Sequence, residues 1–342
     1  MLKNMTRTMA VVAAIALTSG AAVAQEIDDG QIAMTRSELA GKRVGFIPLS
    51  MGIDLGQLWN DVLKRDADRY GYELIVRDAN WNVQAGAQAI NEMIGMNVDV
   101  LVLHPADNQA YVRLVDKAGA AGVPVVQVNM KSPNTGDAYV GANWYAQAQM
   151  MGQAMYDLCA PEHGGNGKIA LITGNMTTPA AFITNKGLED FFQKNPGLTV
   201  VTNQPADYDS TKAMAVASTV LKQTPDLCGF IGHWEVMDMG TAAAVKEAGL
   251  QGKVHIVSSG GGEQKSTCDN VINGNFDVVV SYDAATTARN MSTVVLQMLQ
   301  NKPAEPGKDP FGIYTPSRVV NKENADKGAC WDLESALANG LD

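Results

Sequence analysis

The feature that most constrains the fold is a repeated alternation of short apolar runs with longer amphipathic segments. The runs are rich in Val, Ile and Leu, as in "VDVLVLHP" (98–105), and each is followed by a polar cluster and a segment with helical spacing. Continuous apolar strands that alternate with helices are typical of a parallel sheet covered on both faces. The alternation restarts near residues 139–143. We therefore predict two similar α/β halves, each with its own sheet.

The same pattern gives the expected element boundaries. Strands are predicted at 42–49, 72–79, 98–105, 123–130, 167–174, 198–205, 228–234, 253–260 and 276–283, with a last extended piece at 313–320. Helices are predicted at 55–71, 84–96, 108–121, 144–159, 180–194, 211–223, 237–248, 263–273 and 284–300. A chain of 342 residues exceeds what one compact core usually accommodates, which also favours two domains.

Residues 1–24 have the pattern of a secretory signal. Lys3 and Arg7 precede the apolar run "MAVVAAIALTSGAAVA", whose last three residues form an A-x-A cleavage motif. We expect cleavage after Ala24 and export of the mature protein; retention through an uncleaved signal is the alternative. No cysteine follows the cleavage motif, so no lipid anchor is expected. No other stretch approaches the roughly 18 consecutive apolar residues of a membrane helix.

Charge and cysteine content restrict the partners and the compartment. The formal net charge of −10 argues against nucleic acids and anionic membranes as partners. The four cysteines show neither C-x-x-C nor zinc spacing, so in an oxidising compartment they indicate two disulfides. Three pairings are possible. We predict Cys228–Cys268, because both lie in adjacent strand–helix units, which leaves Cys159–Cys330; buried free thiols are the alternative.

Polar and aromatic residues gather where the predicted strands end. In open parallel sheets a ligand lies outside the carboxyl ends of the strands. These ends carry Asn80-Trp81-Asn82, His104, Asn129, Tyr208-Asp209, His233-Trp234-Glu235 and Tyr282. Aromatic rings pack on the C–H faces of a polyhydroxy compound, and amide and carboxyl groups bind its hydroxyls. The pattern favours a neutral polyhydroxy ligand held between the two halves.

Several stretches together resemble one known family over essentially the whole mature chain. They are "KRVGFIPL", "RYGYELIVRDAN", "VDVLVLHPADNQAYVRLVDKAGAAGVPVVQVN", "YVGANW", "QPADYDSTKA" and "GFIGHWEVMDMGTAAAVKEAG". In these stretches the chain resembles the ribose/galactose-type periplasmic substrate-binding proteins of ABC transporters. The resemblance implies a monomer that binds a sugar in the periplasm and delivers it to a membrane permease.

The resemblance also implies a domain plan. It predicts two Rossmann-like, doubly wound domains joined by three hinge strands, with the ligand in the cleft between them. The crossings are expected near Asn143, Tyr282 and Tyr314. The N-terminal lobe is predicted to hold 42–142 plus 283–313, and the C-terminal lobe 143–282 plus 314–342.

The strand ends and the resemblance together predict eight ligand-binding residues. They are Asp54, Trp81, Asn129, Phe182, Tyr208, Trp234, Glu235 and Tyr282. Phe182 stands where the family has an arginine, and Trp234-Glu235 where it has Asn-Asp, so the site offers more stacking surface and fewer charges than a ribose site. We therefore expect a neutral sugar or sugar alcohol, pentose-sized or nearby. Asp209 is expected to cap a helix.

The remaining candidates carry weaker signals. His104 is interpreted as structural, and His233 is left open between site and core. "SSGGGEQKST" (258–267) lacks the phosphate-loop and dinucleotide patterns, so we expect a glycine-lined wall and no nucleotide cofactor or metal; an acidic or phosphorylated sugar is the alternative there.

Two other functions share parts of this pattern. A ligand-binding partner of a chemoreceptor or sensor kinase would use the same binding chemistry. A sugar-modifying enzyme would need more than His233 with Glu235 as an acid–base pair, because no nucleophile or metal motif accompanies them. We therefore predict a binding protein and not an enzyme.

Overall fold

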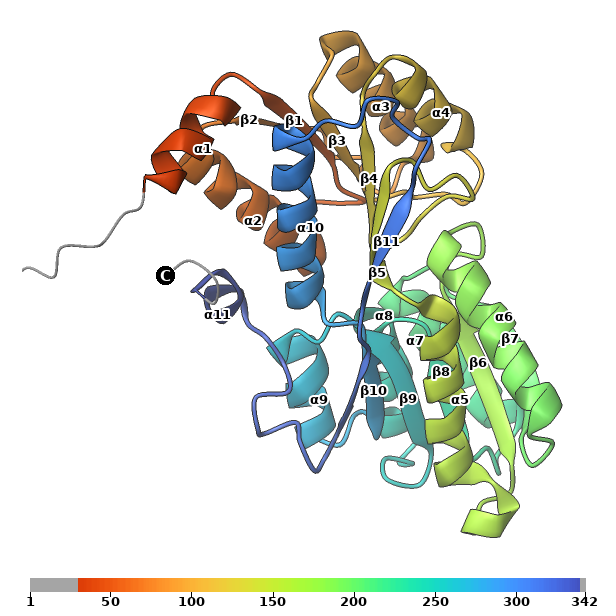
Figure 1. Cartoon of the computed structure of the whole chain (residues 1–342). Helices are drawn as coiled ribbons and strands as arrows, with labels where there is room; N and C mark the ends of the chain where they lie inside the picture. Colours follow the sequence, from red (N-terminus) through yellow and green to blue (C-terminus); the bar gives the residue numbers. More distant parts are fainter. Residues whose placement is uncertain (1–29, 339–342) are drawn as a thin grey trace, which may run out of the picture.

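The computed structural model describes residues 30–338, which form two lobes that each contain a six-stranded sheet (Figure 1). The strand order is β11-β5-β4-β3-β1-β2 in the first sheet and β12-β10-β9-β8-β6-β7 in the second. The predicted two-sheet α/β fold is thus confirmed. The predicted signal segment 1–24 lies outside the described residues.

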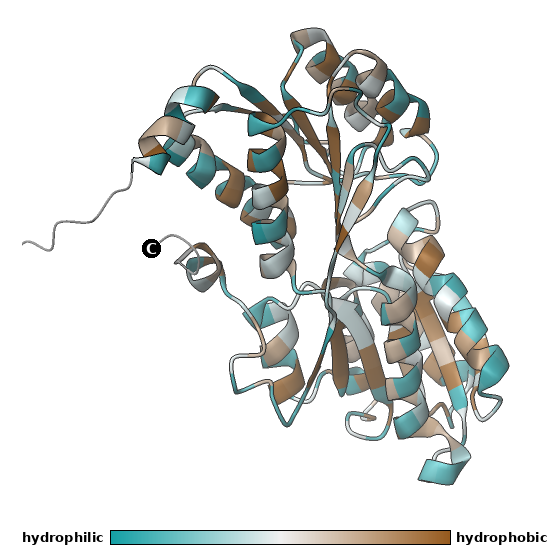
Figure 2. Ribbon diagram, in the orientation of Figure 1, coloured by the Kyte–Doolittle hydropathy of each residue, from teal (hydrophilic) through white to brown (hydrophobic). Residues whose placement is uncertain are grey.

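The first sheet is parallel throughout. Its strands are β1 (Arg43–Ile47), β2 (Glu73–Val76), β3 (Val100–Leu103), β4 (Val125–Val128), β5 (Ala138–Ala142) and β11 (Phe311–Thr315). The accompanying helices are α1 (Gln31–Leu39), α2 (Asp54–Tyr70), α3 (Val83–Met96), α4 (Val112–Ala120) and α10 (Ala284–Gln300). β3 and β4 are buried along their whole length, which explains the continuous apolar sequence of β3 and the three valines of β4 (Figure 2).

The second sheet is parallel except at β12, which runs antiparallel to β10. Its strands are β6 (Lys168–Thr173), β7 (Thr199–Pro205), β8 (Gly229–Gly232), β9 (His255–Gly260), β10 (Val278–Ser281) and β12 (Arg318–Asn321). Its helices are α5 (Trp144–Cys159), α6 (Pro179–Lys194), α7 (Ser210–Gln223), α8 (Glu235–Glu247) and α9 (Asp269–Ile272). A 3₁₀ turn (Pro161–His163) and a π-helical turn (Gln264–Cys268) complete the regular structure described for this lobe.

The two sheets repeat one topology. The order β2-β1-β3-β4-β5 in the first sheet corresponds to β7-β6-β8-β9-β10 in the second. Each of the strands β1–β5 therefore has an equivalent five strands later in the chain. This equivalence allows the loops at the carboxyl ends of the two sheets to be compared pair by pair.

Three local expectations differ from the structure. Helix α1 forms in a segment that carried no strand–helix signal, and it packs against α2 and α10. The last extended piece is two strands, β11 and β12, because Pro316 lies between them and cannot continue a ladder. The helix expected at 263–273 is a π-helical turn followed by the four-residue α9.

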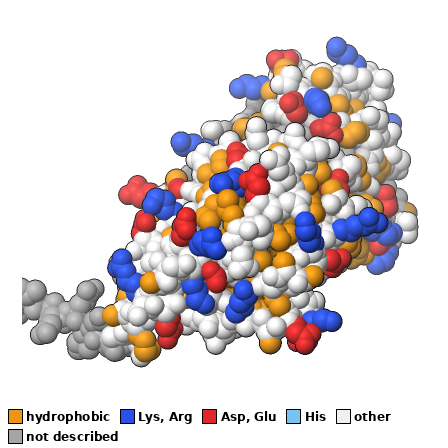
Figure 3. All heavy atoms as spheres, turned by 90° about the horizontal axis from the view of Figure 1, so that it is seen from above, with side chains coloured by type: hydrophobic (Ala, Val, Ile, Leu, Met, Phe, Trp, Pro, Cys, Tyr) orange, Lys and Arg blue, Asp and Glu red, His pale blue; other side chains and the backbone are white. Residues whose placement is uncertain are grey.

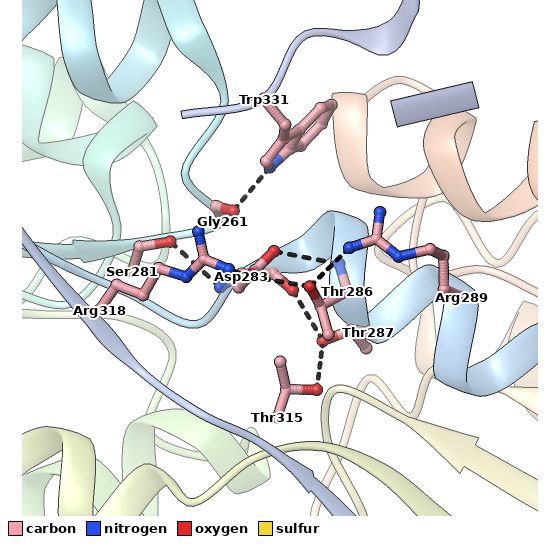
Figure 4. A network of polar contacts seen from close by, with 9 residues as sticks. All are labelled: Gly261, Ser281, Asp283, Thr286, Thr287, Arg289, Thr315, Arg318 and Trp331. Atoms are coloured by element: carbon pink, nitrogen blue, oxygen red, sulfur yellow. Dashed lines mark hydrogen bonds and ion pairs between the residues drawn. The ribbon is translucent and has the colours of Figure 1, made fainter. Parts of the chain in front are cut away.

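The chain crosses between the lobes three times, and two of the crossings are tied together by polar contacts (Figure 4). The crossings follow β5, β10 and β11. Asp283, which begins the crossing into α10, pairs with Arg318 at 2.6 Å and accepts a hydrogen bond from the Thr286 backbone at 3.0 Å. The Thr287 and Thr315 hydroxyls lie 3.0 Å apart. These contacts join the start of α10 to β11 and β12.

The C-terminal tail contacts both lobes. The Trp331 indole donates to the Gly261 carbonyl at 2.8 Å, while its ring packs in the core of the first lobe. Beyond it, α11 (Leu333–Ala338) packs against α2, where Arg65 donates to the Leu337 carbonyl at 3.4 Å. The tail, which the sequence assigns to the second lobe, thus bridges the two.

The two disulfides are Cys159–Cys228 and Cys268–Cys330, so the predicted pairing was wrong. Cys228 lies just before β8, at the amino edge of the second sheet, where α5 ends at Cys159. Cys268 follows β9, at the carboxyl edge. Neighbouring strand–helix units therefore place Cys228 and Cys268 at opposite edges of one sheet.

Two surface properties bear on the environment of the protein. Within residues 30–338, the structure has no helix of the length and apolar character required to span a bilayer. Seen from above, lysine, arginine and acidic side chains are interspersed with apolar ones (Figure 3). Both signs of charge therefore occur close together on this face.

Candidate functional site

A cavity lies where the carboxyl ends of both sheets meet; we call it the main cavity. Its lining comes from both lobes and comprises Leu49, Ile53, Leu55, Trp81, His104, Asn129, Met130, Trp144, Ala180, Ala181, Thr184, Tyr208, His233, Trp234 and Tyr282. No Asp, Glu, Lys or Arg belongs to this lining. The lobes also touch nearby, where the Asn108 N–H donates to the Thr177 carbonyl at 2.7 Å.

Equivalent loops of the two lobes present an aromatic ring to the main cavity. Ala79-Asn80-Trp81-Asn82 follows β2, and Ala206-Asp207-Tyr208-Asp209 follows β7. The two central residues of each loop have positive φ, 45° and 61° in the first and 54° and 63° in the second. This left-handed backbone is unfavourable for ordinary side chains and is often found at ligand sites.

The last residue of each loop caps the next helix. The Asn82 side chain accepts from the Ala85 N–H at 2.9 Å, and Asp209 accepts from the Lys212 N–H at 2.7 Å. The predicted cap at Asp209 is therefore confirmed. Asp207 points away and pairs with Lys212 at 3.0 Å. One short loop in each lobe thus combines a helix cap with an aromatic wall of the cavity.

Three rings form a cluster between the lobes. Trp81 of the first lobe lies 6.0 Å from Tyr208 and 6.2 Å from Trp234, measured between ring centroids. Tyr208 and Trp234, both of the second lobe, are 6.0 Å apart. The Tyr208 hydroxyl lies 3.0 Å from the Thr178 hydroxyl, which fixes its ring. The cluster offers flat apolar faces from both lobes to whatever occupies the cavity.

Two histidines occupy equivalent places in the two lobes. His104 follows β3 and His233 follows β8, and their exposed fractions are 1% and 5%. None of their four ring nitrogens has a hydrogen-bond partner. Burial lowers the pKa of each imidazole to about 3, so both are neutral near pH 7. Each ring therefore has one N–H donor and one nitrogen acceptor that no protein group satisfies.

Neither histidine was among the eight predicted ligand-binding residues: His104 was interpreted as structural, and His233 was left open between site and core. Singly, each looks like a buried core residue. The signal that reveals them is their equivalence, because a histidine follows the third strand of each half.

Asn129 is the third polar group with unused hydrogen-bonding capacity. It is 3% exposed, its φ is 61°, and its Oδ1 has no partner. Its backbone is held in place, because the carbonyl accepts from the Tyr139 hydroxyl at 2.8 Å and from the Trp144 indole at 2.7 Å. The Trp144 ring in turn lies edge-on to Tyr282, with centroids 5.1 Å apart. Buried amide groups without partners are uncommon, which points to a ligand contact.

The structure brings five of the eight predicted residues to the main cavity, namely Trp81, Asn129, Tyr208, Trp234 and Tyr282. Phe182 lies elsewhere: its side chain is 53% exposed, and the same helix lines the cavity with Ala180, Ala181 and Thr184.

Asp54 and Glu235 lie in an adjoining second cavity. Its lining comprises Gly52, Ile53, Asp54, Leu55, Trp234, Glu235, Val236, Gly261, Glu263, Ser266 and Trp331. Burial raises the pKa of Glu235 to about 8. Within residues 30–338 no group of three or more His, Cys, Asp or Glu side chains is placed to hold a metal ion.

Comparison with known proteins places this architecture in a family. A model of the periplasmic binding protein domain matches residues 44–303. The chain belongs to this family. The chain is 28% identical over 190 residues to a D-apiose import binding protein of Paraburkholderia graminis, covering 55% of this chain and 60% of that one. It is 29% identical over 203 residues to a D-ribose/D-allose-binding protein of Pseudomonas aeruginosa, covering 57% and 61%. The matches thus span about 60% of the length of these curated relatives.

Solved structures share the whole fold. An ABC transporter solute-binding protein of Bacillus halodurans with bound myo-inositol matches with a TM-score of 0.75 at 20% identity, over 84% of this chain and 97% of that one. A solute-binding protein of Burkholderia graminis in complex with D-arabinose matches with a TM-score of 0.75 at 21% identity, over 84% and 98%. At this identity the likeness concerns the two-lobed architecture of the periplasmic binding protein.

Proposed function

We propose that this protein binds a neutral monosaccharide or sugar alcohol, pentose-sized or nearby, in the main cavity and delivers it to the permease of an ABC transporter. The observation that carries the proposal is the lining of the main cavity. Three clustered rings face three neutral polar side chains with unused hydrogen-bonding atoms, His104, His233 and Asn129. No ionised side chain belongs to that lining.

The chemistry of a sugar matches this lining. The C–H faces of a sugar ring pack on aromatic side chains, and its edge carries hydroxyls that both donate and accept hydrogen bonds. Each neutral imidazole also donates and accepts, and the Asn129 amide does the same. An anion placed there would lose its hydration without gaining a charged partner. The lining therefore favours a neutral polyhydroxy compound over a sugar acid.

Delivery to a permease requires that ligand binding change the shape of the two-lobed protein. The binding groups come from both lobes, so a ligand stabilises the form in which the lobes are together. A permease can then distinguish loaded from empty protein. The names of the curated relatives, a D-apiose import binding protein and a D-ribose/D-allose-binding protein, support the same role.

The proposal includes several finer points. The protein works as a monomer in the periplasm after cleavage behind Ala24, so mass spectrometry of the exported protein should find Gln25 as its first residue. Its lobes divide as 42–142 plus 283–313 and 143–282 plus 314–342. It returns its ligand unchanged, and therefore acts as a binding protein without catalysis.

The test is a thermal-shift screen of the purified protein against sugars, sugar alcohols and sugar acids. A ligand that binds only the folded state raises Tm. We expect shifts with neutral sugars or polyols and none with their acids. Small-angle scattering with a hit should show a decrease in the radius of gyration. A screen in which only acids raise Tm, or in which no sugar or polyol does, would contradict the proposal.

A further inference from the structure

The second cavity adjoins the main cavity and has the opposite character. Ile53, Leu55 and Trp234 line both cavities, so the two are neighbours across these side chains. The first lobe contributes the start of α2, the second contributes the start of α8 and the loop after β9, and the tail contributes Trp331. A ligand held in the main cavity therefore lies next to a second compartment built from all three parts.

This compartment carries acidic groups without a basic one among its lining residues. Asp54 comes from the first lobe, and Glu235 and Glu263 come from the second. Burial raises the pKa of Asp54 and the repulsion of Glu263 adds to this, while the nearby Lys265, outside the lining, acts in the opposite direction. No lining side chain offers a positive charge to these three carboxyl groups.

Glu235 supplies the observation that points to a ligand. It is 2% exposed, and its Oε1 accepts from the Gly261 N–H at 2.8 Å, but its Oε2 has no partner. Gly260 makes room for the carboxyl group, because a Cβ there would stand 2.2 Å from the Glu235 Cδ. A buried carboxyl oxygen without a partner is costly unless something binds it.

The ring systems of this cavity also favour a cation. Trp234 and Trp331 both line it. Indole faces attract ammonium groups, and carboxylates accept hydrogen bonds from them. A primary ammonium has three N–H donors for the carboxyl oxygens, whereas a quaternary ammonium has none. The combination of two indoles with three carboxyl groups therefore matches a primary ammonium.

We propose that the second cavity is a subsite for a primary ammonium group, so that the preferred ligand is an amino-substituted sugar or cyclitol whose ring lies in the main cavity. The inference rests on the proposed function for the position of the ring. It adds that the amino derivative binds more tightly than its neutral parent. Asp54, at the mouth of the subsite, links the ammonium group to the first lobe.

The acidity of Glu235 gives this subsite a pH dependence. The charged and titratable groups around Glu235 are Asp54 on α2, Asp238 on α8, Glu263 before the π-helical turn, and Tyr282 after β10. The pKa of Glu235 is raised to about 8, mainly by burial, so its carboxyl group carries a proton near pH 7 when the cavity holds no cation. Binding of an ammonium group releases this proton. The preference for the amino derivative should therefore increase from pH 6 to pH 7.5.

The experiment measures Kd by calorimetry at pH 7.5 for matched pairs: D-glucose with D-glucosamine, D-galactose with D-galactosamine, and a cyclitol with its mono-amino derivative. N-acetyl-D-glucosamine, which lacks the charge, serves as the uncharged control. In at least one pair we expect the Kd of the amine to be at least ten-fold lower than that of its neutral parent. N-acetylation should abolish this gain in affinity.

Glu235→Gln should remove the gain, so that the amine and its neutral parent bind with similar Kd, while the amide oxygen can still accept from Gly261. Glu247→Gln, an exposed glutamate at the end of the same helix, is the matched control and should change neither ligand. If Glu235→Gln does not fold, Asp54→Asn is measured instead. This variant should reduce the affinity ratio of amine to parent by at least three-fold.

Three outcomes separate the two proposals. Amines that bind no more tightly than their parents overturn the subsite and leave the proposed function intact. A Glu235→Gln variant that weakens both members of a pair equally also overturns it, since Glu235 then only shapes the cavity. If neither parent nor amine binds in any pair or in the sugar and polyol screen, the proposed function itself fails.

Discussion

The two lobes are built on one plan, and the binding site shows both what they share and where they diverge. After the second strand of each sheet, the loop places an aromatic ring on the cavity, Trp81 in the first lobe and Tyr208 in the second. After the third strand, each contributes a buried neutral histidine. Equivalent positions in two facing lobes thus supply a matched pair of rings and a matched pair of imidazoles.

The lobes diverge after their fourth strands. The first lobe places Asn129 there, while the second places Gly260 and Gly261, which accommodate the carboxyl group of Glu235. All four cysteines of the chain also pair within the second lobe and the tail attached to it. The shared positions provide neutral binding groups, and the divergent ones provide an acidic compartment and covalent cross-links.

The largest expected effect concerns these cross-links. Removing either disulfide, by Cys159→Ser with Cys228→Ser or by Cys268→Ser with Cys330→Ser, should lower the free energy of unfolding of the second lobe by about 4 kcal/mol, because each closes a loop of more than 60 residues. Hydrogen exchange should become faster in β6–β10.

The first lobe supplies the control for this measurement, since its sheet and helices contain no cysteine. Exchange in β1–β5 should change little. Equal acceleration of hydrogen exchange in both lobes would show that the lobes unfold as one unit. The disulfides would then not stabilise the second lobe selectively.

The next effect compares rings from the two lobes. Trp234→Ala should weaken binding of the hit by about 3 kcal/mol, roughly 100-fold, through lost buried area and ring contacts. Trp81 is 41% exposed, so Trp81→Ala should cost about half of that free energy, roughly ten-fold in Kd. Calorimetry on both variants measures the ratio. If Trp234→Ala bound the hit as tightly as the unchanged protein does, the ring cluster would not be part of the binding site.

The paired histidines give a smaller effect that depends on pH. Each has a folded-state pKa of about 3 against an ordinary value of 6.5, so acid protonates the unfolded state first. The stability they contribute is present above pH 6.5 and is lost as the pH falls toward 3. At pH 5 each should account for a loss of about 2 kcal/mol relative to pH 7.5.

His104→Gln and His233→Gln should each remove that part of the acid sensitivity, as measured by urea unfolding at the two pH values. Glu235 and Asp238 oppose this trend, because their pKa values are raised to about 8 and their contribution is lost as pH rises. They are present in all variants, so their effect cancels in the comparison. His163→Gln, on the exposed 3₁₀ turn, is the control and should change nothing. If the two substitutions changed the acid sensitivity unequally, His104 and His233 would not be equivalent residues of the two lobes.

The sequence allowed most of the fold to be predicted because strand and helix periodicity is a local property. The limits of α10, for instance, match the expected 284–300. Relations between distant elements were harder. The disulfide pairing depends on which edge of the sheet each cysteine occupies, and the direction of a side chain on α6 depends on helix phase. His104 was interpreted as structural and His233 was left open because a single strand-end histidine resembles a core residue, whereas two at equivalent positions do not.

Phe182 should show the smallest effect. Successive helical residues turn by about 100°, so the face of α6 that presents Ala180, Ala181 and Thr184 to the main cavity directs Phe182 outward, where it is 53% exposed. Phe182→Ala should leave Kd within about two-fold and change the free energy of unfolding by less than about 0.5 kcal/mol. Thr184→Ala, two residues further along the same helix and 3% exposed, should weaken binding more than Phe182→Ala does. If calorimetry showed that Phe182→Ala weakens binding more than Thr184→Ala, α6 would present a different face to the ligand. Residue 182, where the family has an arginine, would then contact the ligand.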